Sequence, residues 1–247
     1  MELIDDIIQG EILFPRRFAR LEKREYGILY YTPEIPDSFD GNHACILSAP
    51  DPVPALADVR DFYRAMGISP RIYNLTKPGG GLELRQAALE AGFQFGDEAN
   101  QTYVHRRPSS ITPNADLTIR RVQAPSRQLS SMIGQSDGKL AMAVVERSLA
   151  CPDFHLLVGF VGDQPATMAA VERVGNIARV DDVLTRRAFR GKGYARSLIH
   201  ELVRYHMRIV GGPLCLYTDN PTAARIYMEA GFDKLDLPLE CWSAWLE

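Results

Sequence analysis

The chain has 247 residues, of which 46% are hydrophobic and 24% are charged, and its formal net charge at pH 7 is -3. This profile is typical of a soluble globular protein with one or two domains. It argues against nucleic acid as the main partner, because a domain that binds phosphate backbones carries a basic excess.

The N-terminal segment lacks the features of an export signal. Asp5 and Asp6 lie where a signal peptide needs positive charge, and no apolar run approaches the roughly 18 residues of a membrane helix. The four cysteines are far apart, and Cys151 with His155 would supply only two of the ligands of a structural zinc site. We therefore expect a cytoplasmic protein that spans no membrane, holds no metal and keeps its thiols reduced.

The first half of the chain alternates predicted helices and strands. In chain order these are a helix at 57–67, a strand at 71–74, a helix at 82–93 and a closing strand at 102–106. The segment RRPSSITPNAD (106–116) then gathers Pro, Ser, Thr and Asn without apolar periodicity, which is typical of a connector. We expect one domain over 1–106 and a second domain over 117–247.

The second half begins with a predicted strand at 117–122 and two helices, around 125–134 and 139–149. A meander of strands follows, up to residue 185. The next helix has an apolar face at spacings of three and four, formed by Ala195, Leu198, Ile199, Leu202 and Val203.

A buried strand at 214–218 leads to a helix with well-marked ends. Asn220 suits the N-cap, Pro221 suits the first helical position, and Gly231 suits the left-handed residue past the end. An aromatic-rich strand pattern that reaches Trp242 and Trp245 closes the chain.

The segment FRGKGYARSLIHELV (189–203) places two glycines and two basic residues directly before a helix. The first N–H groups of a helix lack intrahelical partners and the helix dipole is positive at that end, so such a turn favours anions. Arg190 and Lys192 add charge that suits phosphate. The alternative is a solvated glycine turn. A nucleotide-hydrolase loop is excluded, because Lys192 is followed by Gly193, and a dinucleotide loop would need a third glycine near Ser197.

Two segments together resemble the signature regions of the GNAT superfamily of N-acetyltransferases, which bind acetyl-coenzyme A. In VLTRRAFRGKGYARSLI (183–199), the pattern Arg/Gln-x-x-Gly-x-Gly/Ala is met by Arg190, Gly193 and Ala195. In LYTDNPTAARIYMEAGF (216–232), the family's Asn, small residue, Tyr and Gly-Phe are Asn220, Ala223, Tyr227 and Gly231-Phe232. Both segments occur in the family's order, and the resemblance covers 117–247.

The resemblance implies an α/β fold with a mixed, mostly antiparallel central sheet flanked by helices. In the family, the strand before the glycine loop is splayed from its neighbour, and the pantetheine arm inserts between the two strands. That strand is here IARVDDVLT (177–185). The implied residues for binding acetyl-coenzyme A are Val183, Leu184, Thr185, Arg190, Gly191, Lys192, Gly193, Tyr194, Ala195, Asn220 and Ala223.

The first half keeps part of this plan. EAGF occurs at 90–93 and again at 229–232, both times between a predicted helix and a strand, which suggests a duplicated unit. Prolines that cannot donate a hydrogen bond stand where the glycines would be, at Pro50, Pro52 and Pro54. We interpret residues 1–106 as a degenerate acetyltransferase-like domain that does not hold the cofactor.

The resemblance also implies catalytic residues. Tyr227 lies where the family places its general acid, and a phenol with a pKa near 10 can protonate a thiolate, although packing against pantetheine is the alternative role. Asp181 is the better candidate for the base. Other family members carry a carboxylate at the position of Arg179, and Glu172 is a further contender, whereas Asp182 suits a structural role.

Strand alternation predicts how these side chains are oriented. A period of two places Arg179, Asp181, Val183 and Thr185 on one face of the strand, and Val180, Asp182 and Leu184 on the other. Backbone N–H groups near Val183 would stabilise an oxyanion.

The sequence thus predicts an acetyl-coenzyme A dependent N-acetyltransferase in which a bound amine attacks directly. The acceptor is a small-molecule amine or the amino group of a peptide, and the sequence does not choose between them or set the oligomeric state. Two alternatives stay open: an inactive acyl-coenzyme A binding sensor or interaction module, and transfer of a longer acyl chain.

Overall fold

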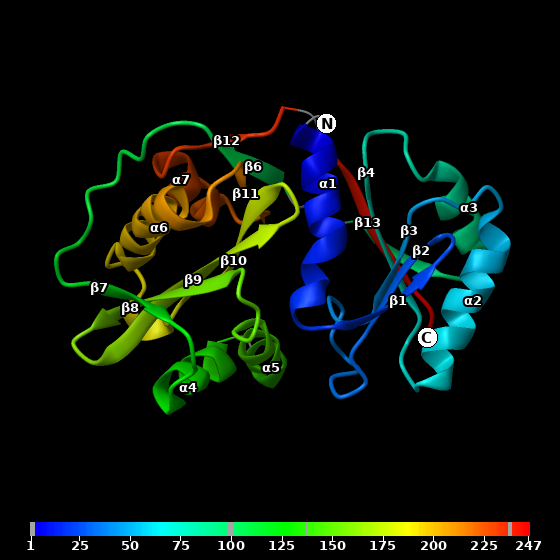
Figure 1. Ribbon diagram of the computed structural model, residues 1–247, viewed down its shortest axis with the longest axis horizontal. Coiled ribbons are helices and arrows are strands. Elements are labelled where there is room, and N and C mark those ends of the chain that lie inside the picture. The colour runs from blue at the N-terminus through cyan, green and yellow to red at the C-terminus, as the bar shows by residue number, and fades with distance from the viewer. Residues whose placement is uncertain (1–2, 98–100, 137, 237–238) are drawn as a thin grey trace. The chain divides into compact units, whose positions relative to one another are not determined.

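The computed structural model describes residues 3–97, 101–136, 138–236 and 239–247. They form two compact units, each with its own β-sheet (Figure 1). Unit 1 consists of residues 1–10 and 101–236, and unit 2 consists of residues 11–100 and 237–247. The first boundary between them falls inside helix α1 (Leu3–Leu13).

Unit 1 contains a seven-stranded sheet in the order β12-β6-β11-β10-β9-β8-β7. β10 and β11 pair in parallel, and the other neighbours pair antiparallel. The strands are β6 (Gln101–His105), β7 (Thr118–Val122), β8 (Phe154–Val161), β9 (Gln164–Val174), β10 (Ile177–Thr185), β11 (Leu214–Thr218) and β12 (Phe232–Lys234).

Helices cover both faces of this sheet, as Figure 1 shows. On one face, α6 (Tyr194–Tyr205) and α7 (Pro221–Glu229) share an apolar core with Val171 and Val180. On the other face, α4 (Arg127–Ser136) and α5 (Gly138–Ser148) share a core with Met168 and Leu184. A 3-10 turn, η2 (Arg187–Phe189), precedes α6, and a π-helical turn, η3 (His206–Val210), follows it.

Unit 2 contains a six-stranded sheet in the order β1-β2-β3-β4-β13-β5, in which β3 and β4 pair in parallel and the other neighbours pair antiparallel. One apolar core joins this sheet to both of its α-helices. The elements are η1 (Phe14–Arg17), β1 (Arg20–Arg24), β2 (Gly27–Tyr31), β3 (His43–Ile46), α2 (Pro52–Ala65), β4 (Arg71–Thr76), α3 (Leu82–Glu90), β5 (Gln94–Asp97) and β13 (Glu240–Trp245).

The predicted mixed, mostly antiparallel α/β fold is confirmed, and the two units follow the same plan. A parallel pair of strands is joined across a helix in each, as β3-α2-β4 and as β10-α6-β11. A second helix and strand follow, as α3-β5 and as α7-β12. Both copies of EAGF end their helix with a left-handed glycine, since φ is +85° at Gly92 and +98° at Gly231.

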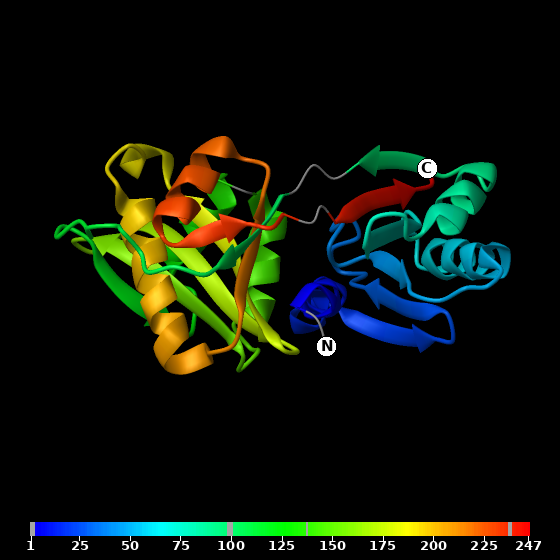
Figure 2. The same cartoon turned by 90° about the horizontal axis from the view of Figure 1, so that it is seen from above.

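The two units exchange their closing strands. β6 follows β5 along the chain, but it pairs with β11 and β12 in unit 1. β13 follows β12, but it pairs with β4 and β5 in unit 2. In Figure 2, the red β13 accordingly lies among the strands of unit 2.

Because of this exchange, the two observed units do not coincide with the expected domains, 1–106 and 117–247. We expected the strand at 102–106 to close the sheet of the first half and the strand near Trp242 to close that of the second half. Each instead lies in the other sheet. The physical reason is that both strands follow the same helix, turn and short strand, and the alternation of apolar residues does not specify which sheet they join.

A buried histidine makes the stability of unit 2 depend on pH. Burial lowers the pKa of His43 from its usual 6.5 to about 4. Its Nδ1 lies 3.1 Å from the carbonyl oxygen of Phe39, and its buried Nε2 has no hydrogen-bond partner among the described residues. The unfolded chain therefore takes up a proton more readily than unit 2 does, so stability is fully present above pH 6.5 and is lost as the pH falls towards 4.

We expect the free energy of unfolding of unit 2 to fall by about 2 kcal/mol between pH 7 and pH 5 because of His43. Urea titration followed by tryptophan fluorescence measures this, since both tryptophans of the chain, Trp242 and Trp245, lie on β13 in unit 2. The control is His43→Leu, which cannot be protonated and should lose less stability over this interval. Equal losses in the two proteins would contradict the assignment.

Candidate functional site

β10 and β11 separate from each other partway along their length. Their parallel pairing joins Ala178 with Leu214 and Arg179 with Cys215 and extends no further. Beyond Arg179, β10 continues to pair with β9 on its other side, up to Thr185. The backbone edge of β10 that faces β11 therefore opens next to Asp181, within the strand that the resemblance predicts to be splayed from its neighbour.

A β-bulge interrupts β10 at this opening. Asp181 pairs with Ala170 and Leu184 pairs with Met168, so β10 has one more residue than β9 between these rungs. Asp182 takes up the extra length in a left-handed conformation with φ of 51°. Leu184 consequently shares a face with Asp181 and packs with Met168 in the core below α4. The predicted simple alternation is wrong beyond Asp181, because a bulge reverses the faces.

We expect Asp182→Val to lower the free energy of unfolding of unit 1 by about 1–2 kcal/mol, because a β-branched residue is strained at positive φ. Asp182→Asn has nearly the same shape and tolerates this conformation, so it serves as the matched control. Differential scanning calorimetry of both variants measures the effect. A Val variant as stable as the Asn variant would show that the bulge relaxes without cost.

The glycine turn lies at the start of α6. Gly191 and Gly193 both have φ of +77°, and a Cβ atom built on either would meet no atom within 4 Å. Gly193 is the N-cap of α6 and provides no side-chain cap for the first N–H groups of the helix. Arg190 Nε donates to the carbonyl oxygen of Thr185 at 3.0 Å, which ties the turn to the end of β10.

Helix α7 begins as its sequence predicts. Asn220 Oδ1 accepts hydrogen bonds from the N–H groups of Thr222 at 2.9 Å and Ala223 at 3.3 Å. Asn220 therefore acts first as an N-cap. One and two turns further along, Ala223 and Tyr227 share the helix face that lies against the glycine turn of α6, and both line the same pocket.

This pocket has a volume of about 840 Å³ and lies between β10, α6 and α7. Ten of its lining residues are among those that the sequence predicts: Val183, Thr185, Arg190, Gly191, Gly193, Tyr194, Ala195, Asn220, Ala223 and Tyr227. Seven others were not predicted: Phe189, Arg196, Ile199, Thr222, Arg225, Ile226 and Glu229. Helical spacing of four residues from Ala195 and of three residues from Ala223 would have indicated Ile199 and Ile226.

Three predicted residues do not line the pocket. Leu184 is buried on the α4 side, and its carbonyl oxygen accepts a hydrogen bond from Thr167 Oγ1. Lys192 is exposed, with its ammonium nitrogen 5.6 Å from the centre of the Phe189 ring. Asp181 lies at the opening of β10, and its charge acts on Tyr227 across it.

The two candidate catalytic groups influence each other. Burial and, to a lesser extent, the charge of Asp181 raise the pKa of Tyr227 to about 12. The phenol therefore stays protonated throughout the neutral range. Asp181 itself forms an ion pair with Arg179, and its Oδ1 accepts the N–H of Asp182 at 3.0 Å.

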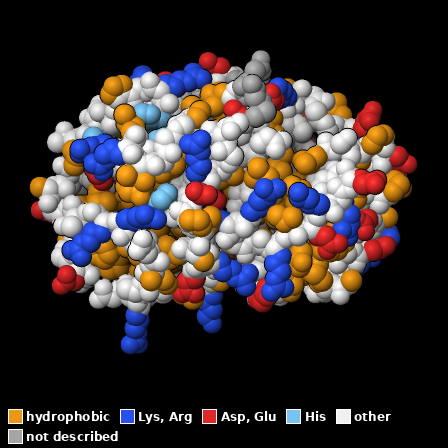
Figure 3. All heavy atoms as spheres, viewed as in Figure 1, with side chains coloured by type: hydrophobic (Ala, Val, Ile, Leu, Met, Phe, Trp, Pro, Cys, Tyr) orange, Lys and Arg blue, Asp and Glu red, His pale blue; other side chains and the backbone are white. Residues whose placement is uncertain are grey.

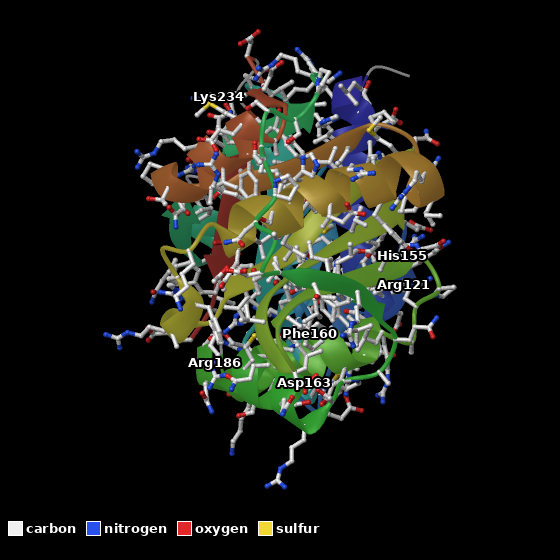
Figure 4. The ribbon with its side chains drawn as sticks, turned by 90° about the vertical axis from the view of Figure 1, so that its left-hand side faces the viewer. Arg121, His155, Phe160, Asp163, Arg186 and Lys234 are labelled. Atoms are coloured by element: carbon white, nitrogen blue, oxygen red, sulfur yellow. The ribbon has the colours of Figure 1, made fainter. Side chains whose placement is uncertain are left out.

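Two other titratable groups considered from the sequence, Glu172 and His155, do not line the pocket. Glu172 is buried on β9, opposite Arg179. His155 Nδ1 lies 3.1 Å from the hydroxyl of Tyr205. Figure 4 shows His155 beside Arg121, on the other side of that view from Arg186, which directly follows β10.

The corresponding place in unit 2 differs at each key position. Aligning the two copies of EAGF matches Tyr227 with Ala88, and aligning the parallel strand pairs matches Asp181 with Leu47. At the start of α2, Asp51 accepts the N–H of Val53 at 3.0 Å. The pocket between α2 and α3 has a volume of about 270 Å³. The interpretation of residues 1–106 as a degenerate domain predicts such differences, and it stays a prediction.

The charged surface, the helices and the cysteines of the described residues each bear on what the sequence predicts. On the face shown in Figure 3, basic and acidic side chains are both scattered among uncharged ones. Within the described ranges, no helix has the length and apolar character needed to cross a membrane. All four cysteines are free thiols.

Residues 131–232 match the acetyltransferase (GNAT) family. The whole chain is similar in fold to the GCN5-related N-acetyltransferase from Kribbella flavida, at 15% identity with a TM-score of 0.72, over 100% of this chain and 97% of that one. It is also similar to a functionally unknown conserved protein from Staphylococcus epidermidis ATCC 12228, at 16% identity with a TM-score of 0.61, over 93% and 94% of the two chains.

A tandem GNAT protein from the clavulanic acid biosynthesis pathway shares the fold at 14% identity with a TM-score of 0.54, over 75% of this chain and 67% of that one. None of the curated proteins matches the chain significantly. The resemblance carried by the two signature segments is confirmed, and residues 131–232 form a domain of the acetyltransferase (GNAT) family.

Proposed function

We propose that this protein is an N-acetyltransferase that transfers the acetyl group of acetyl-coenzyme A to a primary amine, which attacks directly. The family and the fold support acyl transfer in general. The observation that carries the finer proposal is that an open strand edge, an uncapped glycine turn and a buried tyrosine line one pocket of about 840 Å³.

The residues of the pocket fit coenzyme A. The first N–H groups of α6 and the space around Gly191 and Gly193 suit the pyrophosphate, because backbone donors and the helix dipole favour an anion there. The edge of β10 beyond Arg179 is available to pair with the amides of the pantetheine arm. Val183, Ala223 and Ile226 supply apolar lining beside this edge.

When bound, acetyl-coenzyme A supplies the activated acetyl thioester. Asp181 takes the proton that the attacking amine loses, through a water molecule. Tyr227 Oη gives its proton to the departing sulfur, and the proton held by Asp181 then restores the phenol. Because the pKa of Tyr227 is about 12, its transfer to a thiolate is uphill, and we expect the proton to move only as the sulfur leaves.

The acceptor in this proposal is a small-molecule amine or the amino group of a peptide. The test is a thiol-release assay with acetyl-coenzyme A against a panel of polyamines, aminoglycosides, amino acids and peptides, with coenzyme A binding measured in parallel by calorimetry. Turnover on one class supports the enzyme and identifies its acceptor. Tight binding without turnover on any class would point to a sensor, and absence of binding would refute both functions.

A further inference from the structure

Arg179 is a charged residue at the point where β10 and β11 of unit 1 begin to separate. It belongs to the last rung at which β10 and β11 pair, opposite Cys215. Its guanidinium forms an ion pair with Asp181, two residues further along β10, and lies over the ring of Tyr217 on β11, with 5.8 Å between Cζ and the ring centre. The guanidinium thus contacts a side chain on each side of the opening.

The same arrangement holds the carboxylate of Asp181 from two directions. Arg179 Nη1 donates to Oδ2, and the backbone N–H of Asp182 donates to Oδ1 at 3.0 Å. The side chain of Arg179 is only 11% exposed and that of Asp181 is 25% exposed. An ion pair with this little exposure to solvent is weakly screened, so the orientation and the charge of the carboxylate depend on the arginine.

We propose that Arg179 is a positioning residue, which keeps the Asp181 carboxylate ionised and fixed beside the opening between β10 and β11. The proposal rests on the proposed function, because it concerns the base of that reaction. A guanidinium stays charged at every working pH, so the carboxylate keeps its partner under all conditions in which the protein is folded. The planar guanidinium also fixes the direction of its hydrogen bonds to the carboxylate, which a lysine ammonium does not.

Four other titratable groups lie on the strand of Asp181 or on elements next to it. Glu172 lies on β9, opposite Arg179, and Tyr217 lies on β11. Tyr227 lies on α7, and Asp182 follows on β10 itself. Because the carboxylates of Glu172 and Asp182 both disfavour an additional negative charge, the guanidinium of Arg179 is the group in this set that favours an ionised Asp181.

The first test is the proton uptake of Asp181 in the absence of any ligand. Carboxyl carbon NMR follows the midpoint of this titration, and the signal is identified by its loss in Asp181→Asn. In Arg179→Gln we expect the midpoint to rise by about one pH unit or more, and in Arg179→Lys by less, because the lysine keeps the charge. An unchanged midpoint in Arg179→Gln overturns the proposal.

The second test measures transfer and uses only the conservative variant, which keeps the charge and most of the side-chain volume. We expect Arg179→Lys to lower kcat by about tenfold with the KM for acetyl-coenzyme A unchanged, but to have no further effect in an Asp181→Asn background. Equal losses in both backgrounds would show a merely structural arginine and overturn the proposal. Failure of the proposed function appears separately, as wild-type protein that neither binds coenzyme A nor transfers acetyl groups.

Discussion

In Gly193→Asp we expect binding of coenzyme A to weaken by about 100-fold, because two like charges 5 Å apart near a protein surface repel by about 3 kcal/mol. Gly193 is the N-cap of α6 with φ of +77°, and its missing Cβ faces open space. The variant therefore has room for its side chain at the place where the pyrophosphate would approach the helix.

The matched control is Gly193→Asn. Asparagine and aspartate have nearly the same shape and both tolerate a left-handed conformation, so the backbone cost is shared and the difference reports the charge. Calorimetry with coenzyme A measures both affinities. Wild-type affinity in the Asp variant would refute the anion site at α6, and equal losses in the two variants would assign the effect to shape.

Tyr227→Phe should bind coenzyme A with nearly wild-type affinity but turn over about 100-fold more slowly, which is the lower range for loss of a general acid. The ring of Tyr227 is buried between α7 and the sheet, so phenylalanine keeps the packing and removes the hydroxyl. Steady-state kinetics should show the loss in kcat, with the KM for acetyl-coenzyme A little changed.

Tyr205→Phe is the control for this variant. Tyr205 lies in unit 1 near the end of α6, outside the pocket, and its hydroxyl lies 3.1 Å from His155 Nδ1. The control also loses one phenol, so a general effect of that loss would appear in both proteins. An unchanged kcat in Tyr227→Phe would leave the tyrosine with a packing role.

The sequence predicts the elements of the site well because their signals are local. Asn220 and Gly231 mark the ends of α7 through capping and a left-handed glycine, and the glycines before α6 have the positive φ that their residue type allows. These features depend on a few neighbouring residues. The glycine turn and the second helix could therefore be located in the sequence, whereas the binding of an anion at this turn stays a prediction.

The rest depends on contacts that no short segment specifies. The bulge at Asp182 reverses the face of Leu184, yet an aspartate in a strand does not indicate an extra residue. The ion pair of Arg179 with Asp181 follows from two side chains on one strand face, and period two predicts only that they can meet. The partner strands of β6 and β13 are set by the tertiary fold, because their own sequences would suit either sheet.

The exchanged strands impose an order on the folding of the two sheets during synthesis. β4 and β5 of unit 2 emerge from the ribosome before every strand of unit 1, but β13, the strand that joins them, emerges after all of those strands. The sheet of unit 2 therefore cannot close until β13 has been translated, and its unpaired edges stay exposed meanwhile. A premature stop before Glu240 would leave every strand of unit 1 intact and still deprive unit 2 of the strand between β4 and β5.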